Sequence, residues 1–151
     1  MNDVWAMDFM SDRLFDEQSV RILTIVDCFT REALVTAAGT KFRAYHVIDE
    51  LDRLARIRCK PRSIRVDNGP EFAGRLLDQW AYLNKVELGF SRPGKPTDSA
   101  YIEAFNSRLR QKCLNASLFL SMDDARNRID AWGTDCNETR SHSSLGVKFP
   151  S

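Results

Sequence analysis

The order of the apolar segments constrains the fold of this chain more than any other feature. Three segments rich in β-branched residues come first, and two further apolar segments then alternate with stretches of helical periodicity. Strands are therefore expected at residues 4–10, 22–26, 33–37, 62–67 and 86–90. The first two strands form a hairpin through the polar, turn-like residues 12–19, and the fourth strand lies parallel beside the first. This order predicts an α/β fold with a five-stranded mixed sheet flanked by helices.

Four helices are predicted from apolar residues spaced three and four apart. We expect them at residues 40–58, 74–84, 97–113 and 122–137. The side chains expected to face inward from the first three helices are Tyr45, Ile48, Leu51, Leu54, Ala55, Leu76, Leu77, Trp80, Leu83, Ile102, Phe105, Leu109 and Cys113.

The composition is that of a globular protein, and the 151 residues suit a single domain spanning residues 1–151. No apolar run is long enough to cross a bilayer, and no export-type leader precedes the first strand. The four cysteines form no Cys-x-x-Cys pair, so we expect reduced thiols in a cytoplasmic protein. No Gly-rich phosphate loop is present, and no nucleotide triphosphate or membrane partner is expected.

The charge distribution is more informative than the net charge of +1. Six basic residues and no acid lie between positions 53 and 65, namely Arg53, Arg56, Arg58, Lys60, Arg62 and Arg65. Such a run produces a local field that attracts a polyanion. Contact with DNA and a merely solvated surface remain equally open for this run.

Three acids stand inside or beside otherwise apolar elements. Asp8 lies within the first strand, Asp67 ends the fourth strand, and Glu103 lies on the third helix, where it shares a face with Asn106 and Arg110. Ligands bind beyond the carboxyl ends of strands in open α/β sheets, so the three acids can meet at one edge. Carboxylate oxygens suit a divalent cation, and paired cations are the usual apparatus for phosphoryl transfer on nucleic acid.

Each acid taken singly also has a structural interpretation. Asp8 could cap a strand end, Asp67 could form a turn with its neighbours, and Glu103 could be a solvated helix residue. Asp27 follows an apolar strand too, but a turn-forming or Arg31-pairing role suits it better.

Other polar residues near these motifs are assigned lesser roles. We expect Glu71 to lie near the site or to start the following helix, without being a ligand. His142 is expected to pack or to contact DNA, because metal-assisted chemistry needs no histidine base, and His46 has no expected role.

Five stretches in this order give the chain a resemblance to a known family. They are Trp5–Phe9, Leu23–Glu32, Ile64–Phe72, Phe90–Asp98 and Ile102–Asn106. Together they resemble the integrase core of bacterial insertion-sequence transposases, which is similar to retroviral integrase. The resemblance implies a ribonuclease H-like fold.

The resemblance also implies a chemistry. Asp8, Asp67 and Glu103 would be the catalytic acids and would hold two Mg²⁺ ions, or Mn²⁺ as a substitute, when DNA is bound. The activity would be cleavage of a DNA strand followed by strand transfer during DNA integration. DNA contacts are expected from Arg92, Lys95, Asn106 and Arg110. The expected partners are the element ends and target DNA, with the protein acting as a homo-oligomer, most simply a dimer.

Two departures from the family pattern leave alternatives open. The family's aromatic–Asn pair reads Cys136-Asn137 here, and its Arg-Pro-His reads Arg140-Ser141-His142. The helical DNA-binding portion of full-length relatives is expected to be absent before the first strand. The alternatives are a ribonuclease H-like nuclease that does not join strands, and an inactive transposase remnant that only binds DNA or a partner.

Overall fold

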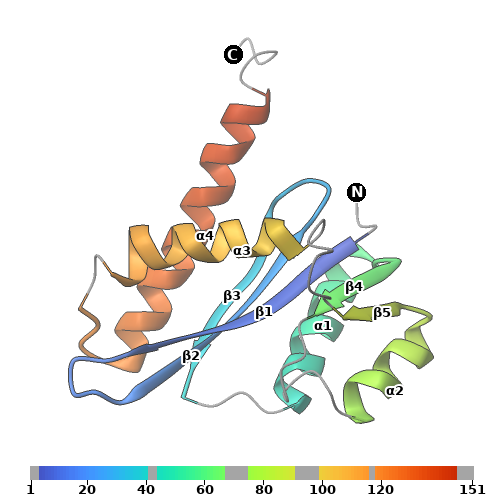
Figure 1. Ribbon diagram of the computed structural model, residues 1–151, viewed down its shortest axis with the longest axis horizontal. Coiled ribbons are helices and arrows are strands. Elements are labelled where there is room, and N and C mark those ends of the chain that lie inside the picture. The colour runs from blue at the N-terminus through green and yellow to red at the C-terminus, as the bar shows by residue number, and fades with distance from the viewer. Residues whose placement is uncertain (1–3, 41–43, 67–74, 91–98, 116–117, 146–151) are drawn as a thin grey trace.

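The computed structural model describes residues 4–40, 44–66, 75–90, 99–115 and 118–145. Its five strands are β1 (Val4–Arg13), β2 (Ser19–Asp27), β3 (Ala33–Gly39), β4 (Ser63–Val66) and β5 (Glu87–Phe90). They form one sheet in the order β3-β2-β1-β4-β5, with β1 at its centre (Figure 1). β2 pairs antiparallel with β1 and β3, whereas β4 pairs parallel with β1 and β5. The predicted five-stranded mixed sheet is therefore confirmed.

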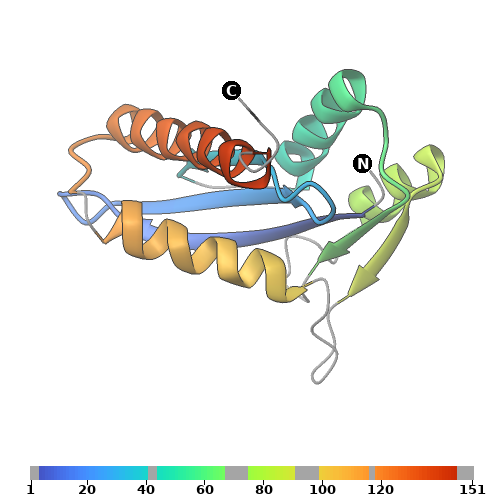
Figure 2. The same ribbon diagram turned by 90° about the horizontal axis from the view of Figure 1, so that it is seen from above.

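The helices divide the core into two layers. They are α1 (Ala44–Arg58), α2 (Arg75–Asn84), α3 (Ser99–Leu109) and α4 (Met122–Leu145), and α3 continues into a π-helical turn, η1 (Arg110–Leu114). Side chains of α1 and α2 pack on one face of the sheet, together with Trp5 and Met7 of β1. Side chains of α3 and α4 pack with Ala6 and Met10 on the other face. Figure 2 shows α3 on the side of the sheet opposite α1 and α2.

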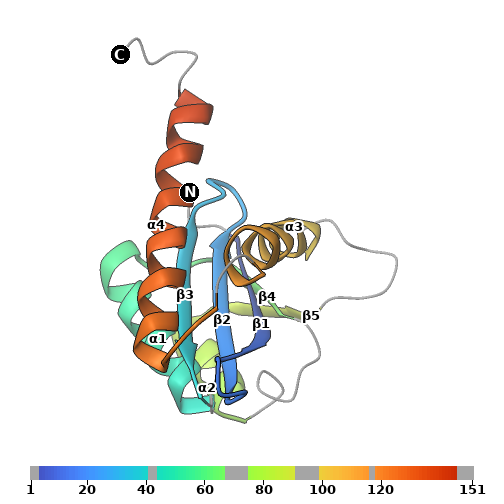
Figure 3. The same cartoon turned by 90° about the vertical axis from the view of Figure 1, so that its left-hand side faces the viewer.

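The last helix lies along the edge strand β3 (Figure 3). A Cβ atom added to Gly133 of α4 would lie 2.8 Å from Oγ1 of Thr36 in β3. The absence of a side chain at position 133 therefore allows this helix to approach the strand closely. The C-terminal part of α4 runs past the end of the sheet (Figure 1).

Several sequence predictions need correction. β1 continues to Arg13 and α4 continues to Leu145, both beyond their predicted ends. Tyr45, Leu76 and Leu83 are exposed, although inward positions were predicted for them. In α2 the buried stripe is instead Leu77, Trp80 and Ala81. Trp80 borders both apolar stripes, so α2 keeps it buried while turning Ala81 inward in place of Leu76 and Leu83. The Trp80 Nε1 donates to Asp52 Oδ1 of α1 at 2.7 Å.

The four cysteines are free thiols, as predicted. Burial raises the pKa of the Cys113 thiol, which lies in the core beneath α3 and α4. Within the described part of the chain, none of the helices combines the length and the apolar character needed to cross a bilayer.

Candidate nucleic-acid-processing site

The hairpin of β1 and β2 fixes the position of Asp8. Asp8 lies on the central strand, and its side chain is on the same face as Ala6 and Met10, beneath α3. It is half-buried, and its Oδ1 accepts a hydrogen bond from the Phe9 N–H at 2.8 Å. The hairpin register places Thr24 directly opposite it on β2.

A buried asparagine from α3 completes this arrangement. Asn106 Nδ2 donates to Asp8 Oδ2 at 3.0 Å. The Thr24 hydroxyl lies within donating distance of Asn106 Oδ1, at 3.0 Å, and of the Asp8 carbonyl oxygen, at 3.3 Å. Thr24 is fully buried and Asn106 nearly so. The three residues, called here the Asp8 network, connect two strands and a helix through neutral donors and fix the orientation of the carboxylate.

Glu103 occupies the next turn of α3 towards the N-terminus. It is exposed, whereas Ile102, Phe105 and Leu109 are buried, as the helical spacing predicted. Glu103 and Asn106 are three residues apart and therefore neighbours on the helix surface. Glu103 therefore lies one turn before the residue that bonds to Asp8, and its approach to Asp8 stays a prediction.

Arg110 holds the end of α3 to the hairpin. Its Nη2 donates to the Ser11 carbonyl oxygen of β1 at 2.7 Å. Arg110 and Asn106 both line a cavity of about 340 Å³ beside Met10. Arg110 also begins the π-helical turn, a local distortion that occurs frequently at functional sites.

Asp27 has the turn-forming role that the sequence favoured. It ends β2 and is fully buried. Its Oδ1 accepts hydrogen bonds from the Phe29 N–H at 2.8 Å and the Thr30 N–H at 3.1 Å. Its Oδ2 lies 3.6 Å from Nη2 of Arg58, which reaches it from α1. This acid is a structural element of the turn between β2 and β3.

The basic run divides into different environments. Arg53 pairs with Glu50 of the same helix at 2.7 Å, and Arg58 pairs with Glu32 at 3.0 Å in addition to Asp27. Arg56 and Lys60 are exposed. Arg62 immediately precedes β4 and Arg65 lies within it. Both line a groove together with Lys85. The run is thus neither one uniform patch nor wholly neutralised.

Several predicted site residues lie outside the described residues: Asp67, Glu71, Arg92, Lys95 and the side chain of His142. The described chain reaches Val66, the last residue of β4. That strand is parallel to β1, with Arg65 in register with Ala6. Among the described residues, no three potential metal-binding side chains gather at one point. The convergence of Asp67 with Asp8 and Glu103 stays a prediction.

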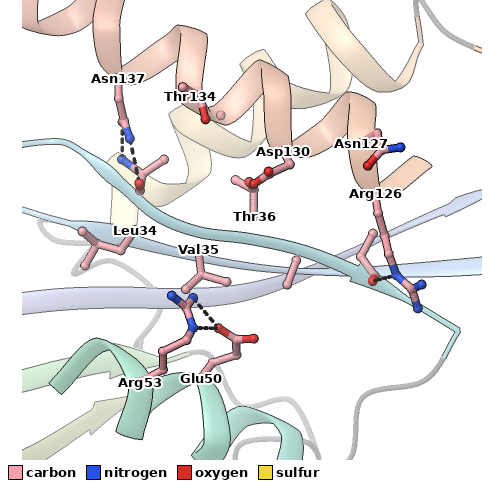
Figure 4. A pocket seen from close by; sticks show the side chains of 14 residues that line it. Leu34, Val35, Thr36, Glu50, Arg53, Arg126, Asn127, Asp130, Thr134 and Asn137 are labelled. Atoms are coloured by element: carbon pink, nitrogen blue, oxygen red, sulfur yellow. Dashed lines mark hydrogen bonds and ion pairs between the residues drawn. The ribbon is translucent and has the colours of Figure 1, made fainter. Parts of the chain in front are cut away.

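Another groove lies over the outer edge of the sheet, between β3, α1 and α4 (Figure 4). Its volume is about 570 Å³. The Asn137 side chain pairs with both backbone groups of Ala33, accepting from its N–H at 2.7 Å and donating to its carbonyl oxygen at 2.9 Å. Arg126 Nε donates to the Ala38 carbonyl oxygen at 3.1 Å. These two side chains of α4 cap both ends of β3.

Sequence reasoning missed two of these relationships. The hydrogen bonds of Thr24 with Asp8 and Asn106 were not predicted, although pairing the first two strands outward from residues 12–19 sets Thr24 opposite Asp8. The pairing of Asp27 with Arg58 joins residues 31 positions apart on different elements, and no local pattern signals it.

Comparison with known families agrees with the motifs. Two family models, each described as an integrase core domain, match residues 1–96 and 84–150. An uncharacterized 31.7 kDa protein of insertion element IS407 from Burkholderia multivorans is 46% identical over 99% of this chain and 54% of its own length. An uncharacterized protein of insertion element IS476 from Xanthomonas euvesicatoria is 41% identical over 96% and 42%. The chain thus spans about half the length of the curated relatives it matches.

More distant similarities extend to a transposase and to solved structures. The InsF transposase of insertion sequence IS3A from Escherichia coli is 26% identical over 99% of this chain and 52% of its own length. The HTLV-2 integrase catalytic core, solved with magnesium in a dimeric form, aligns with a TM-score of 0.62 and 19% identity, covering 85% of this chain and 83% of that core. A chain of the simian T-cell lymphotropic virus intasome, solved in complex with PP2A regulatory subunit B56 gamma, aligns with a TM-score of 0.68 and 22% identity, covering 83% of this chain and 46% of that chain. The predicted ribonuclease H-like fold is confirmed.

Proposed function

Because this chain belongs to the integrase core domain family, we propose that it is a transposase catalytic core that cleaves a DNA strand and transfers the freed 3′ end to another strand. The observation that carries the proposal is the Asp8 network. It orients a half-exposed carboxylate on the central strand beneath the helix that bears Glu103. β4, which leads into Asp67, runs parallel beside it.

The residues present fit a divalent cation. Both oxygens of Asp8 accept a hydrogen bond, yet each carboxylate oxygen has two lone pairs and can accept a second partner. Ligating carboxylates are themselves normally hydrogen-bonded, and Asn106 supplies that support here. Asp8, Glu103 and Asp67 would hold Mg²⁺, or Mn²⁺ in its place. When bound, the cations supply Lewis-acid activation of the attacking oxygen and charge stabilisation of the leaving oxygen.

The protein's own contribution is positioning. Asn106 and Thr24 keep the Asp8 carboxylate in one rotamer, and Arg110 fixes the end of α3 to β1 through Ser11. Asn106 was predicted to contact DNA, but its amide is committed on both sides to the Asp8 network, so we propose that it acts by positioning Asp8. Contacts of Arg92, Lys95 and Arg110 with DNA phosphates remain part of the proposal, as does assembly into a dimer.

The test is a strand-cleavage and strand-transfer assay with DNA carrying the terminal repeats of the parent element. Asp8→Asn, Asp67→Asn and Glu103→Gln should each abolish both reactions while the far-UV circular dichroism is retained. Asp49→Asn, an exposed carboxylate on α1, is the matched control and should keep full activity. If one of the three variants stayed active, the assignment of that residue to the catalytic site would be wrong.

Metal binding gives a second readout. Titration of Mn²⁺ followed by electron paramagnetic resonance should show binding to the wild-type chain and weaker binding to Asp8→Asn. Hydrolysis without joining would favour the nuclease alternative, and metal binding without either reaction would favour an inactive remnant. Equal Mn²⁺ binding by wild type and Asp8→Asn would contradict the placement of the metal at Asp8.

A further inference from the structure

A groove of about 730 Å³ lies at the end of the sheet where β1, β4 and β5 begin. Its charged lining consists of Arg62, Arg65, Lys85 and Glu87, which gives three positive charges against one negative charge. Tyr82, on the last turn of α2, also lines the groove and is 83% exposed. An exposed aromatic ring among cations is the combination that binds a nucleic-acid strand.

Two of these cations are not neutralised within the described part of the chain. No ion pair of Arg62 or Lys85 with a described carboxylate is present, and both side chains are exposed. Arg53 and Arg58, from the same basic run, are each paired with acids. The groove therefore keeps two cations without an ion pair to a described carboxylate, whereas Arg53 and Arg58 of α1 are paired.

The backbone at Lys85 ends α2 in a left-handed conformation. The N–H of Val86 donates to the Ala81 carbonyl oxygen at 2.9 Å, and the N–H of Lys85 donates to Tyr82 at 3.3 Å. This is the hydrogen-bond pattern that closes a helix with a left-handed residue, and Lys85 has φ = 57°. Glycine is the unstrained residue there, so a lysine accepts strain at the rim of the groove.

The groove is close to Asp8 along the sheet. Ser63, Arg65 and Glu87 alternate with buried residues of the α1–α2 layer, so they lie on the face that carries Asp8. Arg65 is in register with Ala6, two residues before Asp8. A rise of about 3.3 Å per residue and a strand spacing of about 4.8 Å place the two α-carbons roughly 8 Å apart. This distance corresponds to two or three nucleotides at about 3.4 Å per nucleotide.

We propose that this groove holds the phosphate backbone of the DNA strand that reacts at Asp8, with Tyr82 stacking on an unpaired base of that strand. The inference rests on the proposed function only in taking DNA as the substrate. Arg65 contacts a phosphate two or three nucleotides from the reacting bond, and Arg62 and Lys85 contact phosphates farther along the same strand. Contacts of this kind fix register and orientation without reading sequence.

The experiment measures DNA binding by fluorescence anisotropy at several salt concentrations, with EDTA present so that no reaction occurs. The double variant Arg62→Ala/Lys85→Ala should reduce the slope of log K against log salt by about 1.8 for duplex DNA, at about 0.9 per lost phosphate contact. The control Arg56→Ala/Lys60→Ala removes the same charge from exposed positions outside the groove and should leave the slope unchanged. Equal slopes for the two double variants would overturn the inference.

A glycine pair separates binding from folding. Lys85→Gly and Cys59→Gly both relieve a left-handed residue that follows a helix, since Cys59 has φ = 70° after α1. Both variants should unfold at the wild-type temperature or above it. Only Lys85→Gly should weaken DNA binding, and unchanged binding by this variant would contradict the inference.

The role of Tyr82 has its own pair of variants. Tyr82→Ala should weaken binding to a single-stranded oligonucleotide roughly 5- to 150-fold, the range for loss of one base–aromatic stack. Tyr82→Phe should bind like wild type. Every binding measurement is made in EDTA and needs no cleavage, so failure of the cleavage proposal and failure of the groove proposal give different results. Equal binding of the oligonucleotide by Tyr82→Ala and wild type would contradict the proposed stacking of Tyr82 on a base.

Discussion

Asp8 and Asp27 are both acids on the strands of one hairpin, yet their surroundings differ. Asp27 is fully buried, closes a turn through two backbone N–H groups and lies 3.6 Å from the guanidinium of Arg58. Asp8 is half-exposed and is oriented by an amide side chain and one backbone N–H. A fully enclosed acid needs a cation from the protein itself. An acid that is oriented and still reaches solvent can accept an external ligand.

The largest effect is expected when the buried acid is removed. Asp27→Ala should destabilise the fold by about 3 kcal/mol, because it deprives two N–H groups of their acceptor and leaves Arg58 without its buried partner. Urea denaturation followed by circular dichroism measures the change. Asp8→Asn should cost less than about 1 kcal/mol, since an amide can still accept from Phe9. Similar losses for the two variants would refute the distinction.

A second test adds a negative charge beside Asp8. Asn106→Asp would set a carboxylate about 3 Å from Asp8, a distance at which like charges raise the pKa of one member of the pair. A carboxyl group whose pKa is higher in the folded state than in the unfolded state stabilises the fold below its unfolded-state pKa of about 4. This stabilisation is lost as the pH rises. We expect a loss of about 1–3 kcal/mol at pH 7 relative to wild type and a smaller loss at pH 4.

Thermal melts at the two pH values with and without Mg²⁺ measure this change, and Mg²⁺ should restore part of the stability. The control is Gln79→Glu, which adds a carboxylate at an exposed position of α2 with no acid three or four residues away and should lack this loss at pH 7. A loss for Asn106→Asp that did not vary with pH would show that the added charge does not couple to Asp8.

A third test removes one hydrogen-bond donor from the Asp8 network. Thr24→Val keeps the buried volume but leaves Asn106 Oδ1 without the hydroxyl, so a loss of about 1 kcal/mol is expected. Thr36→Val, on the neighbouring strand, should change the free energy of unfolding by less than about 0.5 kcal/mol. A double-mutant cycle of Thr24→Val with Asn106→Ala should be non-additive, and simple additivity would show that the network is not coupled.

The smallest effect concerns a third acid, on the exposed first turn of α4. The Leu120 N–H and then Arg128 hold the pKa of Asp124 below its usual range, because both interactions favour the ionised form. A lowered folded-state pKa gives stability that is present above the unfolded pKa and lost as the pH falls through the folded value. Asp124→Asn should therefore melt slightly below wild type at pH 7, and the two curves should converge in acid. A difference that persisted in acid would point to a cause other than charge.

Much of the fold was predictable because strand and helix periodicity are local properties. The hairpin, the central position of β1 and the parallel placement of β4 follow from segment order. The errors occurred where two local solutions compete. Trp80 fits a stripe with Leu76 and Leu83 as well as one with Leu77 and Ala81. The choice depends on how α2 packs against the rest of the core, which the sequence of α2 does not contain.

The candidate site was predictable only in part. Asp8 and Glu103 stand out because acids are unusual in apolar elements, and Glu103 is exposed on α3 beside the buried Ile102. The role of Asn106 depends on how α3 lies against β1 and β2, a tertiary relationship that helical spacing does not contain. The groove at Lys85 was also missed, since its cations come from separate segments and meet only in the folded chain.

The capping of β3 by α4 has a consequence for how the protein behaves at high concentration. Exposed strand edges are templates on which other chains can add a strand and begin to aggregate. Asn137 occupies both backbone groups of Ala33, and Arg126 occupies the carbonyl of Ala38, so the longer outer strand of the described sheet offers a poor template. The opposite edge is β5, a strand of four residues. A chain shortened before Asn137 would expose backbone groups at the start of β3. We expect such a chain to aggregate at high concentration before any change in its reaction is seen.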